Sequence, residues 1–283
     1  MTPPHIGNSV SASRWRGFTL IELLVVIGII GVLIAIALPA LRGANQAAKR
    51  TKALANIRST GQQFDDFANR EGHYPFRAPG ALPPGVPEDR EFPESLFMVR
   101  WWPGSAIVAT SNHFEHEVFW PGVLVPEIED WPQHYETWIS PGLPTELPDE
   151  EAMFAGDGEE FDARDLISVR YANSFVARPE TWNAQEQGTI DRMQSIRPTK
   201  AHEVAFPSAK VMLWDGHLAY LTSPWPEERE GHLDAQTPMF FADGHGAAHN
   251  PLEASEPIDN PLNDDWDEKR LSDTRDGILG RDY

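Results

Sequence analysis

Aspartate and histidine residues gather in the C-terminal third of the chain, where side chains of these types could bind a transition metal. Imidazole nitrogens and carboxylate oxygens are ligands that zinc takes in proteins. Their spacings match no standard zinc motif, and the chain has no HExxH, G-x-S-x-G or phosphate-loop sequence. The alternative is structural, with His232 hydrogen-bonded to a turn at Asp243 so that it locks a sheet. The residues of this His–Asp group are Asp215, His217, His232, Asp243 and His245.

An acidic stretch at residues 157–162 carries oxygen ligands that could hold calcium. It lacks the spacing of a twelve-residue calcium loop, and charge runs are usually solvated. The chain has no cysteine, which excludes disulfides, thiolate metal sites and a cysteine nucleophile. We therefore expect no cofactor and no enzyme activity, with calcium or zinc binding as the open alternatives.

Tryptophan and Pro-Gly pairs alternate through residues 76–150, which predicts an irregular lobe with many turns. A stacked surface that includes Trp101 could bind a sugar or a peptide. Large aromatic side chains more often fill a core beneath long loops, so core packing is the alternative to ligand binding here.

The first element of the chain is an apolar run from Phe18 to Leu41, in which Glu22 is the only charged residue. About 20 apolar residues in a helix cross the hydrocarbon core of a bilayer, so this run predicts a transmembrane helix. A carboxylate there costs several kcal/mol, on the order of magnitude of insertion scales, unless it is paired or neutralised. Glu22 therefore either reaches headgroup water or meets a cationic partner inside the membrane.

Residues 16–22, RGFTLIE, resemble the N-terminal signal of type IV pilins and type II secretion pseudopilins. The resemblance implies that a prepilin peptidase cleaves between Gly17 and Phe18 and methylates the new amino terminus. Glu22 then becomes the fifth mature residue and pairs with the Phe18 amine of a neighbouring subunit. Pro39 also matches the family, in which a proline at this depth loosens the helix inside a filament.

The same resemblance implies partners and a location. The partners are the prepilin peptidase, other pilin or pseudopilin subunits, an inner-membrane assembly platform and the lipid bilayer. A count of basic residues would put the C-terminal side in the cytoplasm, but long domains translocate largely regardless of such counts. The resemblance implies the opposite orientation: a single pass through the inner membrane, a cytoplasmic N-terminus, and a periplasmic domain or a place in a periplasmic or surface filament.

Charge is distributed unevenly. The chain carries 43 acidic and 23 basic residues, a net charge of −20, which argues against a nucleic-acid partner. Between Glu22 and Asp65 there is no acid. This basic collar either faces anionic lipid headgroups or, as the resemblance implies, meets acidic heads of adjacent subunits. The collar residues are Arg42, Lys49, Arg50, Lys52 and Arg58.

Beyond the apolar run, an apolar stripe at helical spacing predicts that the helix continues to about Asn69, followed by Gly72 and Pro75 as stop signals. Its second half must bury this stripe against a soluble domain. The stripe consists of Leu54, Ile57, Phe64 and Phe67. The predicted fold class is α+β, a long helix packed on an antiparallel β-sheet head. The predicted parts are a leader at 1–17, a transmembrane helix at 18–41, its soluble continuation at 42–72, a head at 73–249 and an acidic extended tail at 250–283.

Short strands are predicted at residues 106–110, 118–120 and within 166–177. Asp215-Gly216 and Asp243-Gly244 each follow an apolar run, so both read as hairpin turns between neighbouring strands. His232 and Asp243 are separated by ten residues, which resembles, with one insertion, the His-x9-Asp-Gly signature of a pilin-like family expanded in planctomycete-type bacteria.

The function that these features favour is a structural pseudopilin or minor pilin-like subunit of a type II secretion or type IV pilus-like system. The alternative is a membrane-anchored periplasmic domain that binds a glycan or peptide, or a metal-dependent enzyme.

Overall fold

The structure is a computed structural model of the 283-residue chain. It describes residues 19–86, 93–100, 107–110, 113–126, 128–147, 167–183, 192–221, 234–258, 260 and 270–283. The chain divides into two compact units, residues 1–45 and residues 46–283, and the second is called the head unit below. Helix α1, Leu20–Glu71, contributes to both units.

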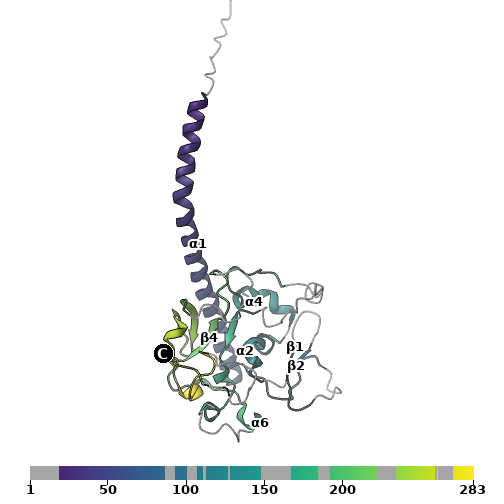
Figure 1. The fold of residues 1–283 in the computed structure, drawn as a ribbon. Helices are drawn as coiled ribbons and strands as arrows, with labels where there is room; N and C mark the ends of the chain where they lie inside the picture. The colour runs from purple at the N-terminus through teal and green to yellow at the C-terminus, as the bar shows by residue number, and fades with distance from the viewer. Residues whose placement is uncertain are drawn as a thin grey trace, which may run out of the picture. The chain divides into compact units, whose positions relative to one another are not determined.

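The first unit contains the apolar half of α1, drawn in purple (Figure 1). Among the described helices, α1 is the one that is long and apolar enough to cross a membrane. None of the residues in its most apolar window is buried, and large apolar side chains from Leu20 to Leu41 are exposed. Such a surface requires an apolar surrounding outside the chain itself. The helix includes Pro39, so the chain stays helical through this position.

The second half of α1 packs into the core of the head unit. Ile57, Phe64 and Phe67 are buried and Leu54 is partly buried, which confirms the predicted stripe. The helix ends at Glu71, two residues after the predicted end, and Gly72 follows with φ +80°. Glycine adopts this left-handed conformation without steric cost, which is why it ends the helix.

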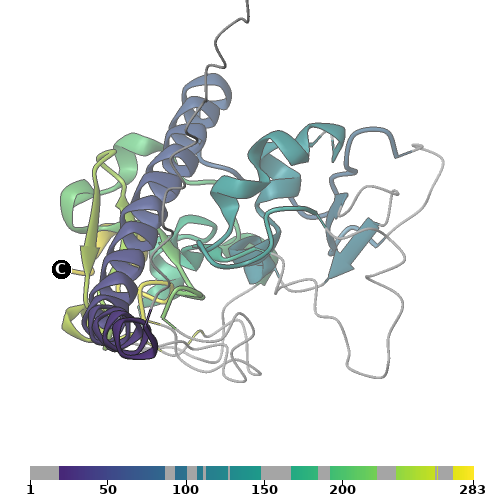
Figure 2. The same ribbon diagram turned by 90° about the horizontal axis from the view of Figure 1, so that it is seen from above.

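A four-stranded antiparallel sheet with strand order β3-β4-β5-β6 forms the centre of the head unit. Figure 2 shows α1 running beside the yellow-green strands of this sheet, and Gly61 of α1 lies directly against the ring of Phe240 in β5. The α+β fold class is therefore confirmed. The strands are β3 Val169–Tyr171, β4 Val211–Asp215, β5 Thr237–Phe241 and β6 Gly246–His249.

A separate antiparallel pair, β1 Phe97–Arg100 and β2 Ile107–Thr110, lies away from this sheet in both views (Figures 1 and 2). The prediction of a strand near residues 106–110 is thus confirmed for Ile107–Thr110. Between β2 and β3 the chain forms the short helices α2 His116–Phe119, α3 Pro121–Leu124 and α4 Trp131–Trp138, and between β3 and β4 it forms α6 Arg192–Ser195. The described 3-10 turns are at 113–115, 128–130, 173–175, 179–182, 201–203, 207–209, 251–253 and 277–279.

The strand predicted at residues 118–120 is wrong, because Val118 and Phe119 end helix α2 and Trp120 links it to α3. Val, Phe and Trp favour strands mainly because they pack well on a half-buried surface, and here a buried helical turn offers the same burial. Pro121 occupies the first position of α3, where its missing N–H and fixed φ suit a helix start.

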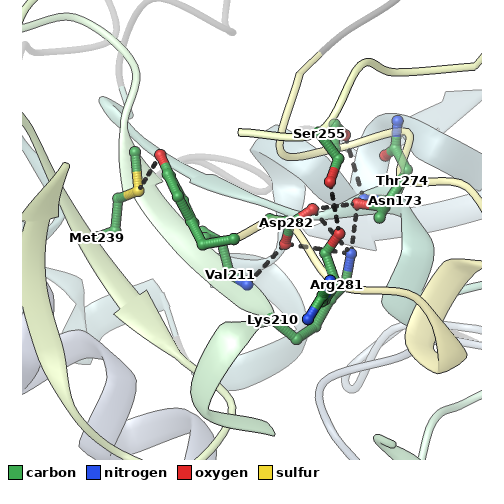
Figure 3. A network of polar contacts seen from close by, with 10 residues as sticks. Asn173, Lys210, Val211, Met239, Ser255, Thr274, Arg281 and Asp282 are labelled. Atoms are coloured by element: carbon green, nitrogen blue, oxygen red, sulfur yellow. Dashed lines mark hydrogen bonds and ion pairs between the residues drawn. The ribbon is translucent and has the colours of Figure 1, made fainter. Parts of the chain in front are cut away.

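Residues 270–283 pack into the head unit rather than forming an extended tail. Lys210, whose side chain is completely buried, donates to Thr274 and lies 3.4 Å from the Asp282 carboxylate (Figure 3). The same carboxylate accepts the backbone N–H of Val211 at 2.7 Å. Burial lowers the pKa of Lys210, and the negative charges of Asp282 and Asp273 oppose this shift. This segment is thus attached to the start of β4 by buried polar contacts.

Candidate functional site

The start of α1 holds the Glu22 carboxylate in a defined position. Thr19 donates to Glu22 Oε2 twice, from its backbone N–H at 2.9 Å and from its hydroxyl at 2.8 Å. The Glu22 N–H in turn lies 3.3 Å from Thr19 Oγ1. This is a reciprocal capping box, which satisfies N–H groups that a helix start leaves without partners. The T-x-x-E spacing signals it in the sequence, although Thr19 was not among the predicted site residues.

The capping box leaves part of the Glu22 carboxylate available. Both bonds from Thr19 reach Oε2, and Oε1 has no hydrogen bond to any described residue. Glu22 is exposed on the surface of the first unit. Gly17 and Phe18 lie outside the described residues, so the predicted cleavage position has no structural account here. Pro39 lies within α1, 17 residues after Glu22.

The His–Asp group divides into two separate pairs in the described residues. Asp215 and His217 are buried at the end of β4, whereas Asp243 and His245 occupy the exposed turn between β5 and β6. No set of three or more metal-ligand side chains forms among the described residues. His232 lies outside them, so its predicted bond to the Asp243 turn stays a prediction, as does metal binding by the complete group.

Asp215 organises the loop that follows β4. Its Oδ1 accepts the N–H groups of His217 and Leu218, each at 3.1 Å, and its Oδ2 accepts the hydroxyl of Ser140 at 2.8 Å. Burial raises the pKa of Asp215, while these bonds and the nearby Arg170 charge oppose the rise. A carboxylate whose acceptor sites are used in this way holds the loop in place.

The Asp215-Gly216 hairpin turn is a wrong prediction. Strands β4 and β5 are antiparallel neighbours, as predicted, but a segment of more than twenty residues connects them. Among the described residues of this loop, Leu218 has a positive φ, at +46°, and Gly216 does not. The loop conformation follows from the side-chain bonds of Asp215, which a dipeptide rule cannot take into account.

The ring of His217 lies among polar groups of β3 and of the residue that precedes this strand. Its Nε2 lies 3.1 Å from Arg170 Nη2 and its Nδ1 lies 3.4 Å from Ser168 Oγ. Because a guanidinium group only donates, Nε2 is the acceptor of this pair and Nδ1 carries the proton. In the described residues, both ring nitrogens of His217 thus face polar groups of the head unit.

The Asp243-Gly244 turn is confirmed as the connection between β5 and β6. Gly244 has φ +89°, and Asp243 Oδ1 accepts from the N–H of His245 at 3.1 Å and contacts its Nδ1. Burial by itself would raise the pKa of Asp243, but the hydrogen bonds from His245 lower it overall. Four residues, 242–245, separate the strands, two more than in the tightest hairpins.

The described tryptophans of the Pro-rich lobe are core residues. Trp120, Trp131 and Trp138 are completely buried. The rings of Trp120 and Trp131 each contact the ring of Trp138 edge-on, with ring centroids 5.5 Å apart. Their positions leave no ring face for a sugar, which favours packing over binding for these three residues. Trp101, and the predicted calcium ligands at 157–162, lie outside the described residues.

An exposed apolar helix that starts at a Thr–Glu capping box and continues into an α+β head unit defines a pilin-like subunit with a membrane-anchoring helix. Residues 16–38 match the family model described as a prokaryotic N-terminal methylation motif. The chain is 34% identical over 116 residues to type II secretion system core protein G of Dickeya chrysanthemi, covering 38% of this chain and 76% of the relative. The chain therefore belongs to the type II secretion system core protein G family, as a pseudopilin-type structural subunit.

Two further relatives agree with this assignment. Core protein G of Klebsiella pneumoniae is 30% identical over 128 residues, which cover 41% of this chain and 91% of the relative. The type IV major pilin protein PilA of Myxococcus xanthus is 39% identical over 74 residues, covering 23% of this chain and 34% of the relative. No solved structure matches the chain. The resemblance of the C-terminal part to a His-x9-Asp-Gly family is not confirmed by these comparisons.

Proposed function

We propose that a prepilin peptidase cleaves this chain between Gly17 and Phe18 and methylates the amine of Phe18, and that the product assembles with other subunits through α1. The observation that carries the proposal is the position of Glu22. Its carboxylate is held at the helix start through Oε2, while Oε1 stays open toward the surroundings of the helix. A carboxylate in an apolar setting is stabilised by a cation, and a newly formed amino terminus on a neighbouring subunit supplies one.

The location follows from the same proposal. The head unit lies on the periplasmic side of the inner membrane, the leader lies in the cytoplasm where the peptidase acts, and an assembly platform receives the anchored subunit. This orientation requires the long acidic part of the chain to be translocated across the inner membrane. Large domains are translocated largely regardless of the charges near the membrane helix.

The test combines mass spectrometry with one pair of variants. The native protein is expected to begin with N-methylated Phe18. Glu22→Ala is expected to abolish subunit cross-links while the protein remains in the membrane fraction, since only the pairing between subunits is lost. Glu71→Ala is the matched control, because it removes the same side chain at the opposite end of α1, where Glu71 forms an exposed ion pair with Arg70.

Two results would contradict the proposal. One is an intact Met1 terminus in cells with an active peptidase, and the other is normal cross-linking in Glu22→Ala. A binding or enzymatic function is not proposed, because the described tryptophans are buried and the described His–Asp pairs are engaged within the head unit.

A further inference from the structure

The basic collar of α1 divides into residues that are used inside the chain and residues that are not. Lys52 forms an ion pair with Glu136 at 2.5 Å, and Arg58 donates to the carbonyl oxygen of Gly246 in β6. Both side chains therefore attach α1 to the rest of the head unit. This division matters because a basic side chain that is not paired within the chain is available to bind an anionic partner.

Arg42, Lys49 and Arg50 form no ion pair with any described residue. Arg42 and Arg50 are exposed, and Lys49 is half-buried, with its ammonium group beside Gly142 at the edge of the head unit. No acid occurs between Glu22 and Asp65, so five positive charges stand together in this stretch, whereas the remainder of the chain carries a net charge of −25. These three bases are the part of the collar that is available to an anionic partner.

Their positions along the helix favour a lipid surface as that partner. Arg42 immediately follows Leu41, the last residue of the apolar run, and Arg50 lies eight residues further on. At about 1.5 Å per residue, the three bases span roughly 12 Å of the helix axis next to the hydrocarbon boundary. Side chains on a helix tilt toward its N-terminus, and long basic side chains extend along apolar surface to reach charge. Arg42 and Arg50, which are exposed, can therefore reach the phosphate level, while the ammonium group of Lys49 lies on the same stretch of α1 beside Gly142.

We propose that Arg42, Lys49 and Arg50 bind the phosphate groups of anionic phospholipids in the leaflet on the head-unit side. The proposal rests on the membrane anchoring of α1 proposed above. These bases hold the start of the head unit against a negatively charged bilayer surface, which compensates for the repulsion between that surface and the acidic remainder of the chain. Lys52 does not take part, because Glu136 neutralises it within the head unit.

The test measures lipid selectivity at the boundary of the full-length protein. The protein is reconstituted in phosphatidylcholine vesicles that contain spin-labelled phosphatidylglycerol or spin-labelled phosphatidylcholine, and electron spin resonance gives the motionally restricted fraction of each. We expect phosphatidylglycerol to be preferred several-fold at low salt, since each base near an anionic surface changes a binding constant by up to about fivefold. The preference should fall in high salt, because screening shortens the range of these charges.

Matched variants locate the site. The triple variant Arg42→Gln/Lys49→Gln/Arg50→Gln should remove the preference. Lys49→Gln should reduce it, whereas Lys52→Gln, which removes an equal charge one turn further along α1, should leave it unchanged. Both single variants lie on the surface of the same helix, so a general effect on folding would appear in both.

Two results would overturn the proposal. The first is equal restriction of the two lipids by the unchanged protein, and the second is a preference that survives the triple variant. In the second case, loss of cross-linking between copies in the triple variant would assign these bases to the acidic head of a neighbour. Absence of any restricted lipid would contradict membrane anchoring itself, and so separates failure of the anchor from failure of the headgroup site.

Discussion

Asp65 is a carboxyl group whose ionisation opposes folding. It lies half-buried on α1, and its Oδ2 faces Gly244 in the β5–β6 turn. Burial, together with the charges of Asp66 and Asp243, raises the pKa of Asp65 from 3.8 to about 6. Between these two values the folded protein holds a proton that the unfolded chain releases. The contribution of Asp65 to the free energy of unfolding therefore falls as pH rises through this window.

Asp65→Asn should consequently stabilise the protein above pH 6 and have little effect below pH 4. The expected gain at pH 7 is about 1 kcal/mol after allowance for solvent screening of a half-exposed group. The measurement is unfolding of the detergent-solubilised full-length chain, followed by tryptophan fluorescence at several pH values. Asp234→Asn serves as the control, because Asp234 is exposed and its charge is not among those that raise the pKa of Asp65. Parallel pH profiles for wild type and Asp65→Asn would contradict the assignment.

At the level of single residues, the sequence could identify Glu22 as a candidate site residue, because an isolated charge in an apolar run is unusual. It could not predict the uses of Asp215 and His217, since these depend on Ser140, Ser168 and Arg170, which approach only in the folded protein. Local sequence shows that such residues could do chemistry. It does not show whether their lone pairs and protons are already engaged by partners distant in the chain.

Among the elements, α1 and β5 approach closely because of a glycine. A side-chain carbon at Gly61 would come within 2.4 Å of the buried ring of Phe240, so this position accepts no larger residue without movement of that ring. Glycine inside a helix costs about 1 kcal/mol relative to alanine. Its presence at a buried helix position is therefore explained by the packing of the helix against the strand.

Gly61→Ala should destabilise the head unit, because overpacking of about 1–3 kcal/mol exceeds the gain in helix propensity. Gly43→Ala is the matched control on the same helix, since no heavy atom lies within 4 Å of the corresponding position. Thermal unfolding of the full-length chain should show a lower midpoint for Gly61→Ala and no loss for Gly43→Ala. Equal midpoints for the two variants would contradict the close contact between α1 and β5.

The elements differ in how far their sequences determine them. Helix α1 could be predicted almost to its last residue, because its apolar pattern and its stop signals all lie within the same segment. The turn at Asp243-Gly244 could be predicted for the same reason. Residues 118–120 could not, since Val118 and Trp120 are buried equally well by a helical turn or a strand, and only contacts such as Phe64–Trp120 select the helix.

For the whole molecule, the first unit carries the membrane anchor and the second unit carries the folded head. The apolar half of α1 belongs to the first unit, and residues 270–283 belong to the second. In the second unit, the backbone N–H of Ala205 donates to Ile278, and the N–H of Val211 donates to Asp282. Removal of residues 270–283 would leave Lys210 buried without its carboxylate, which is strongly destabilising. The head unit should then fail to fold while the membrane anchor persists.

A chain that ends at residue 269 should therefore remain in the membrane fraction but lose the protease resistance of its head unit. Two substitutions in the complete chain test the same point more finely. Ile278→Ala should cost about 2–5 kcal/mol because this side chain is fully buried, whereas its exposed neighbour Leu279→Ala should cost little. Limited proteolysis of membranes, read with an antibody against the head unit, distinguishes these outcomes. If the shortened chain were as resistant as the complete one, residues 270–283 would be an appendage, and the buried pair of Lys210 and Asp282 would not hold this segment in the core.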